Sequence, residues 1–298
     1  MNKQFGVIEI GSTNTKAYKI FNGSIVECGF KTIEFKKHHS ISGSIVDSDM
    51  NLLIDFINDA FCAPIDIYVY ATSIFRELTT DEVSLIETLL RRDTFTVSFE
   101  VVSAQYENEL TVTGAIRNVP LDGNICVFVG GGGSTEISIC NNGNITEMAN
   151  TKFGVSDVLK QFPDLAENIA HTTIDEVTNY IDKRLNLPAQ KAEYLILAGG
   201  DFLLRYQNAK YPAIKNSMFS SLDHPLIISY KKNREFEDIY FHQLSLADIK
   251  KSTPDNPNWW NGTRSMCAFT NSVARAVGAK IIIPTRISMI RGIVAQHN

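Results

Sequence analysis

The chain opens on three short apolar segments separated by turns. Residues 5–10, 15–21 and 24–29 are rich in residues that favour strands, and Asn22-Gly23 is a typical hairpin dipeptide. Stretches with helical spacing then alternate with strand-like stretches. We expect helices over 51–61, 80–92 and 104–117, and strands over 65–71 and 95–102. The first half therefore predicts the order β-β-β-α-β-α-β-α.

The same opening returns in the second half of the chain. Strands are expected over 124–129, 135–140 and 145–151, with a glycine-rich turn after the first and the hairpin turn Asn141-Asn142-Gly143-Asn144 after the second. Later elements are expected to be a helix over 174–185, a strand over 194–197, a helix over 264–279, a strand over 280–283 and a helix over 287–296. Residues 202–262 carry a weaker pattern. Duplication of a three-strand meander followed by α/β units is the simplest account.

Composition agrees with a two-domain globular protein. The chain has 298 residues, of which 44% are hydrophobic and 20% charged. A formal net charge of −5 does not favour binding to nucleic acid. The five cysteines are scattered and form no CxxC, which argues against a disulfide framework and a cysteine metal site. We find no signal peptide and no apolar run of membrane-spanning length, so a cytoplasmic protein without membrane contact is expected.

Two turns have the composition of an anion site. They are Gly11-Ser12-Thr13-Asn14-Thr15 and Gly131-Gly132-Gly133-Ser134-Thr135, at equivalent places in the two halves. Glycines let successive N–H groups converge on one anion, and the hydroxyls add uncharged donors. Either turn alone is more often only a hairpin, but two equivalent turns predict that the halves share a phosphate-bearing ligand. There is no GxxxxGK[ST], so the chain has no P-loop.

Several motifs resemble one family in their order along the chain. They are VIEIGSTNTKAYKI, YATSIFRE, VVSAQYENEL, GGGSTEIS, FGVSDVLKQF, LAGGDFLLR and ISMIRGIV. The chain resembles the exopolyphosphatase and guanosine pentaphosphate phosphohydrolase (Ppx/GppA) family of the actin-like ATPase superfamily. The resemblance implies two ribonuclease-H-like α/β domains that face each other across a cleft. We place the first at 1–121 with the C-terminal helix 287–298, and the second at 122–286. A homodimer is a possible assembly.

The resemblance also implies roles for residues of the two turns and their surroundings. Arg76 matches an arginine that reaches substrate phosphate, Glu107 the general base for the attacking water, and Glu136 an acid associated with metal and water. Glu9 and Glu136 would hold Mg²⁺ or another divalent cation. Phosphate-binding positions would be Gly11, Ser12, Thr13, Gly132, Gly133, Ser134 and Thr135. Gly199 and Gly200 match a glycine pair that lies near a nucleoside in superfamily kinases.

The sequence departs from the family pattern at metal-site positions. Glu9 replaces the usual aspartate of the first loop, and Val129 stands where the second loop usually has an acid. Asp201 is one conceivable replacement. We expect hydrolysis of a phosphoanhydride, with orthophosphate released from inorganic polyphosphate or guanosine pentaphosphate. A phosphate- or nucleotide-binding sensor that has lost its activity and an ATP-dependent phosphotransferase remain alternatives.

Other polar and aromatic residues have simpler explanations. Lys36-Lys37-His38-His39 is expected to be a solvated basic loop rather than a metal site. Trp259-Trp260 is expected to anchor a loop on the core. Arg76 could alternatively pair with Glu77 or Asp81 at the surface.

Overall fold

The computed structural model describes residues 4–11, 14–61, 65–91, 96–243, 245–254 and 257–297. The chain forms two compact units. The first is Met1–Leu110 with Ile293–Asn298, and the second is Thr111–Gly292. The chain therefore changes unit inside two helices, α4 (Ala104–Ile116) and α11 (Met289–His297). The domain limits predicted at 121/122 and 286/287 stay a prediction.

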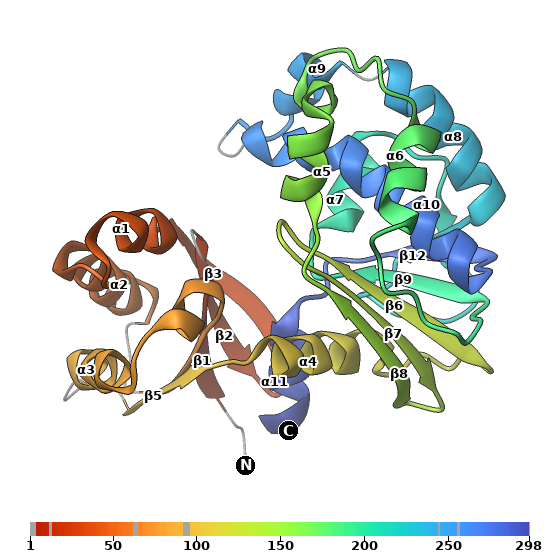
Figure 1. The fold of residues 1–298 in the computed structure, drawn as a ribbon. Coiled ribbons are helices and arrows are strands. Elements are labelled where there is room, and N and C mark those ends of the chain that lie inside the picture. Colours follow the sequence, from red (N-terminus) through yellow and green to blue (C-terminus); the bar gives the residue numbers. More distant parts are fainter. Residues whose placement is uncertain are drawn as a thin grey trace. The chain divides into compact units, whose positions relative to one another are not determined.

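The first unit is built on a five-stranded mixed sheet with the strand order β3-β2-β1-β4-β5 (Figure 1). The β1–β2 and β2–β3 pairs are antiparallel, whereas β1–β4 and β4–β5 are parallel. The strands are β1 (Gln4–Ile10), β2 (Asn14–Phe21), β3 (Ser24–Thr32), β4 (Asp66–Ala71) and β5 (Thr96–Val101). The helices besides α4 are α1 (Phe35–Ser42), α2 (Asp47–Ala60), α3 (Thr80–Leu90) and the 3-10 helix η1 (Ser73–Glu77).

Helix α2 covers one face of this sheet through aromatic contacts with glycines. An added Cβ on Gly29 would lie 2.8 Å from the Phe56 ring, and one on Gly6 would lie 2.7 Å from Phe61. Only glycine lets these rings pack so closely on the strands. On the other face, the end of α11 contributes His297, whose ring centroid lies 4.3 Å from that of Tyr68.

The second unit repeats the first sheet and extends it. Its order is β10-β11-β12-β9-β6-β7-β8, so β8-β7-β6-β9-β12 follows the same path as β3-β2-β1-β4-β5 with the same strand directions. This confirms the predicted structural repeat. The strands are β6 (Asn124–Gly130), β7 (Thr135–Asn141), β8 (Asn144–Thr151), β9 (Tyr194–Ala198), β10 (Ile214–Lys215), β11 (Leu226–Ser229) and β12 (Ile281–Pro284).

The repeat extends to backbone detail. The predicted hairpins have nearly the same geometry, with φ of 49° and 78° at Asn22-Gly23 and of 48° and 77° at Asn142-Gly143. Positive φ at both central residues is the signature of the tight hairpin turn that Asn-Gly favours. Each second strand also carries one register shift, after Ala17 in the first unit and after Ile139 in the second.

The helices of the second unit gather around α10 (Thr263–Val277), which is almost entirely buried. Figure 1 shows α6 (Ile174–Asp182) and α8 (Tyr230–Gln243) beside it on one side of the sheet. Shorter helices are α5 (Val155–Gln161), α7 (Phe202–Asn208), α9 (Leu246–Lys250) and the 3-10 helices η2 (Pro163–Ala166) and η3 (Pro257–Gly262).

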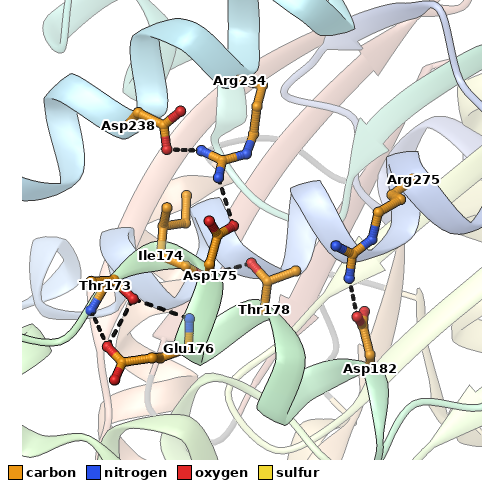
Figure 2. A network of polar contacts seen from close by, with 9 residues as sticks. All are labelled: Thr173, Ile174, Asp175, Glu176, Thr178, Asp182, Arg234, Asp238 and Arg275. Carbon is orange, nitrogen blue, oxygen red and sulfur yellow. Dashed lines mark hydrogen bonds and ion pairs between the residues drawn. The ribbon is translucent and has the colours of Figure 1, made fainter.

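Polar contacts at the surface join three of these helices (Figure 2). Arg234 of α8 pairs with Asp175 of α6 at 2.7 Å and also with Asp238, and Arg275 of α10 pairs with Asp182 of α6. A capping box at Thr173 and Glu176 starts α6. Such partly exposed ion pairs contribute little to stability, and the buried apolar face of α6 supplies most of the stabilisation.

Two expectations from the sequence require comment. The basic stretch Lys36-Lys37-His38-His39 is not a loop, because it lies in α1, where His38 Nδ1 is 2.8 Å from the buried Asp49 carboxylate. The Trp259-Trp260 expectation is confirmed for Trp260, which is fully buried and donates from Nε1 to Thr253 Oγ1 at 2.6 Å. In the described part of the chain, no helix is both long enough and apolar enough to cross a membrane.

Candidate active site

The two glycine turns are closed by the same backbone hydrogen bond. The N–H of Gly11 donates to the carbonyl of Asn14 at 2.9 Å, and the N–H of Gly131 donates to that of Ser134 at 3.0 Å. The residues that close the two turns therefore correspond, Gly11 with Gly131 and Asn14 with Ser134. Ser12 and Thr13, which are predicted to bind phosphate, lie outside the described residues.

The second turn is held in place from behind by the start of α5. The N–H groups of Val155 and Ser156 donate to the carbonyls of Gly131 and Gly132 at 3.1 and 2.8 Å. Gly154 makes this approach possible, because an added Cβ would lie only 2.7 Å from the Gly131 oxygen. Gly132 and Gly133 are exposed, and no carbonyl of the described residues accepts from their N–H groups. The turn thus uses its carbonyls internally and leaves amide donors for an anion.

Thr135 ends this turn, and its side-chain hydroxyl is already used in a hydrogen bond within the protein. Its hydroxyl donates to the carbonyl of Phe153 at 2.8 Å, and the residue is 1% exposed. A ligand contact through this hydroxyl would require that bond to break. Its phosphate-binding role stays a prediction, whereas its contribution to anchoring the turn is visible.

Strand register shows which acids correspond between the units. Glu9 lies opposite Lys16 across β1 and β2, and Val129 lies opposite Glu136 across β6 and β7. Glu9 and Val129 are therefore equivalent, as are Lys16 and Glu136. Directly opposed side chains share one face of a sheet. Each unit carries one acid at this pair, on the first strand in the first unit and on the second strand in the second unit.

Arg76 and Glu107 meet within the first unit. Arg76, in η1, donates from Nε to the carbonyl of Val102 at 2.7 Å and pairs through Nη2 with the Glu107 carboxylate, in the first turn of α4. Neither Glu77 nor Asp81 takes the arginine. Ser73 begins η1 with a φ of 56°, a conformation that costs energy in a non-glycine residue. The fold therefore brings together two residues predicted for one reaction.

A pocket of about 320 Å³ adjoins the second turn inside the second unit. Its backbone walls are the predicted Gly199 and Gly200 and the turn segment 130–132. Gly199 has a φ of 79°, and an added Cβ would lie 2.4 Å from Val129, so glycine is required there. The side chains that line the pocket are Val155, Asp201, Phe202, Arg205, Trp259, Thr263 and Met266.

Arg205 reaches this pocket from a buried ion pair. Its Nη2 lies 3.1 Å from the Glu237 carboxylate, and the two residues are 2% and 0% exposed. The hydroxyl of Tyr211 also donates to Glu237 at 3.1 Å. Burial raises the pKa of Glu237 to about 7, although Arg205 and Tyr211 act in the opposite direction. The pair joins α7, which contributes to the pocket wall, to α8.

Asp201, the conceivable replacement for the acid missing at Val129, lines this pocket and caps α7, and its role at a metal stays a prediction. Its Oδ1 accepts from the N–H of Leu204 at 2.8 Å, which caps α7, and from Nε of Arg286 at 3.1 Å. These two bonds hold the carboxylate at the start of α7.

Carboxylate oxygens are the side-chain donors that a divalent cation would use at this site. The described residues contain no group of three histidine, cysteine, aspartate or glutamate side chains that could hold a metal. Mg²⁺ commonly uses one or two carboxylates together with substrate phosphates and water. Glu9 in the first unit and Glu136 in the second each offer one carboxylate suited to that mode, so each fits a cation that substrate helps to bind.

Sequence reasoning missed several residues that shape the site. Gly154 stands in FGVSDVLKQF, and its glycine before a short helix was a usable signal. The hydroxyl of Tyr18 donates to Glu9 at 2.9 Å, but in the sequence Tyr18 looks like any aromatic residue of a strand and carries no signal of this contact. Arg205 and Glu237 are 32 residues apart, and a sequence pattern does not pair them.

Comparisons with known proteins identify the family of the chain. The sequence model of the "Ppx/GppA phosphatase family" matches residues 50–237, which is more than half of the chain. The chain belongs to this family. Its two mixed α/β units have the fold of solved Ppx/GppA and exopolyphosphatase structures. No curated protein matches the sequence significantly.

Solved structures show the same fold at low sequence identity. A Ppx/GppA phosphatase from Aquifex aeolicus is 12% identical with a TM-score of 0.71, and 99% of each chain is covered. An exopolyphosphatase from Cytophaga hutchinsonii is 17% identical with a TM-score of 0.71, covering 99% of this chain and 97% of its own. An exopolyphosphatase-like protein is 18% identical with a TM-score of 0.67.

Proposed function

We propose that this protein hydrolyses a phosphoanhydride bond and releases orthophosphate from inorganic polyphosphate or guanosine pentaphosphate. The observation that carries the proposal is the second glycine turn. Its carbonyls are held by Val155 and Ser156, and its exposed amides remain as donors. Phosphoryl transfer depends mostly on such positioning and charge stabilisation. Membership of a phosphatase family supports the same reaction.

Each residue of the site has a distinct task in this proposal. Arg76 binds a phosphoryl oxygen with its planar guanidinium, and the turn amides bind another. Glu107 accepts a proton from the attacking water. Glu9 and Glu136 would hold Mg²⁺, which supplies neutralisation of phosphoryl charge when bound. Substrate phosphate would replace the Glu107 carboxylate as the partner of Arg76. The carboxylate then becomes available to accept the proton.

A phosphate-release assay tests the proposal directly. Purified protein is incubated with polyphosphate, guanosine pentaphosphate or ATP in the presence of Mg²⁺ or Mn²⁺. We expect metal-dependent orthophosphate release from at least one of the first two substrates. Absence of release from both, with every metal, would exclude the hydrolase.

A phosphate-binding sensor without turnover is the second candidate, and Val129 favours it. Valine offers no metal ligand at the position equivalent to Glu9. The sensor predicts saturable binding of guanosine tetraphosphate or pentaphosphate by calorimetry with no orthophosphate produced. Turnover with a normal metal response would remove this candidate.

Replacing Val129 by aspartate distinguishes a weakened hydrolase from a dedicated sensor. The new carboxylate would lie opposite Glu136 on one face of the sheet, where a cation can bind between two acids. We expect phosphate release to rise about tenfold, which corresponds to about 1.4 kcal/mol of transition-state stabilisation. Val129→Asn introduces a side chain of the same size as aspartate but without the charge, and it should give no increase in phosphate release. An equal rise in both variants would contradict a metal-site explanation.

The pocket beside the turn favours a nucleotide among the possible substrates. Trp259 is 38% exposed and lines the pocket together with glycine backbone, and its indole ring is suited to stacking on a base. Trp259→Ala should raise KM for guanosine pentaphosphate by about 5- to 150-fold, because stacking on an aromatic residue is worth about 1–3 kcal/mol. KM for polyphosphate should stay unchanged. Equal losses for both substrates would assign Trp259 to the fold.

ATP binding, dimerisation and cellular location are further proposals for this protein. An ATP-dependent phosphotransferase would bind ATP near Gly199 and Gly200, and ATP should then raise the melting temperature. A homodimer would be visible by light scattering. A cytoplasmic location fits phosphorylated substrates of this kind.

A further inference from the structure

Tyr18 of β2 contacts the predicted metal ligand of the first unit. Its hydroxyl donates to Oε2 of Glu9 at 2.9 Å, and the tyrosine is 5% exposed. Tyr18 lies opposite Val7, two residues along β1 from Glu9, so both side chains are on one face of the sheet. The contact therefore follows from strand register and is not a chance meeting of surface side chains.

We propose that Tyr18 is a positioning residue that orients the Glu9 carboxylate toward a divalent cation. This inference rests on the metal-binding role proposed for Glu9. Glutamate has one more rotatable bond than the aspartate usual at this position, and each freely rotating bond costs entropy when a ligand is fixed. A hydrogen bond from a buried phenol restricts that extra bond. Residues that hydrogen-bond a metal ligand commonly tune metal affinity in this way.

The neighbours of Glu9 allow a matched comparison. Tyr70 lies directly beside Glu9 in the register of β1 and β4 and is 6% exposed, so it resembles Tyr18 in burial and position. Its hydroxyl lies 3.2 Å from Nε2 of His297. Burial raises the pKa of Tyr70 to about 12, so this phenol stays protonated at neutral pH. Lys16, opposite Glu9, is the nearest cation in the register. Tyr18 is thus the tyrosine whose hydroxyl holds the acid.

Metal binding measured without turnover tests the proposal. The dissociation constant of Mn²⁺ is determined by electron paramagnetic resonance for the wild type, Tyr18→Phe and Tyr70→Phe, each with its melting temperature. We expect Tyr18→Phe to weaken Mn²⁺ binding by about 10- to 100-fold. The Mg²⁺ concentration for half-maximal phosphate release should rise in parallel, with kcat at saturating Mg²⁺ retained. Tyr70→Phe should bind Mn²⁺ as the wild type does.

A second background separates positioning from general damage. In Glu9→Asp the carboxylate is one methylene shorter and withdraws from the Tyr18 hydroxyl. Adding Tyr18→Phe to Glu9→Asp should then leave Mn²⁺ affinity unchanged. Wild-type affinity in Tyr18→Phe, or an equal loss in both backgrounds, would overturn the inference while leaving phosphate release by the wild type intact. A wild type that releases no phosphate but binds Mn²⁺ would count against the proposed function alone, and one that binds no Mn²⁺ overturns this inference.

Discussion

Glu107→Gln should lower the rate of phosphate release by about 10²- to 10⁴-fold, the usual contribution of a general base. Glutamine keeps the shape of the side chain and a hydrogen bond to Arg76, but it cannot accept the proton of the attacking water. KM should change little, because the phosphate contacts proposed for Arg76 and for the turn do not involve the Glu107 carboxylate. The measurement is orthophosphate release at saturating metal on whichever substrate the wild type uses.

A control for Glu107 lies on the same helix. Glu109 is two residues further along α4, where it accepts from the side chain of Gln105 at 2.9 Å. Glu109→Gln changes the net charge by the same amount and should keep wild-type activity. Unchanged turnover in Glu107→Gln would remove Glu107 from the chemistry, and equal losses in both variants would indicate a general effect on α4.

The repeated opening of each half was predictable because its signals are local. Alternating apolar strands, an Asn-Gly hairpin and a glycine turn are adjacent in sequence, so they specify the meander without long-range information. The correspondence of Glu9 with Val129 follows from the same alignment of the two halves and agrees with the strand register. The turns themselves were likewise identified from composition alone.

Helices that bury polar residues could not be predicted from the spacing of apolar residues. Helix α8, within the weakly patterned region, buries Asn233 and Glu237 beside Tyr240 and Phe241, so its apolar spacing is interrupted where it meets the core. Helix α1 buries Phe35, and its other apolar residue, Ile41, is 78% exposed, so the segment resembled a loop. Apolar periodicity detects a helix only when the core side of that helix is apolar.

Contacts between residues far apart in the sequence could not be predicted either. The general base and the phosphate-binding arginine were each proposed from their motifs. Their contact joins residues 31 apart on different elements, Arg76 in η1 and Glu107 in α4. Surface partners such as Glu77 were equally plausible from proximity along the chain. Only the packing of η1 against the end of β5, where Arg76 bonds the carbonyl of Val102, selects the observed partner.

Glu237→Ala should reduce the free energy of unfolding of the second unit by about 3–5 kcal/mol, because it leaves the charge of Arg205 buried without its carboxylate. Both side chains are almost wholly inaccessible to water, and Tyr211 also loses an acceptor. The two tryptophans of the chain, Trp259 and Trp260, lie in this unit, so their fluorescence during urea unfolding reports on it.

Two controls separate the buried charge from a simple loss of volume. Glu235→Ala on the same helix removes an exposed acid that lies 3.9 Å from Lys231, and it should change stability by less than about 1 kcal/mol. Replacing the pair together, as Arg205→Met with Glu237→Leu, should recover most of the lost stability, because apolar residues can replace a buried pair without an uncompensated charge. A double variant no more stable than Glu237→Ala would show that the polar network with Tyr211, and not charge balance, is what holds α7 against α8.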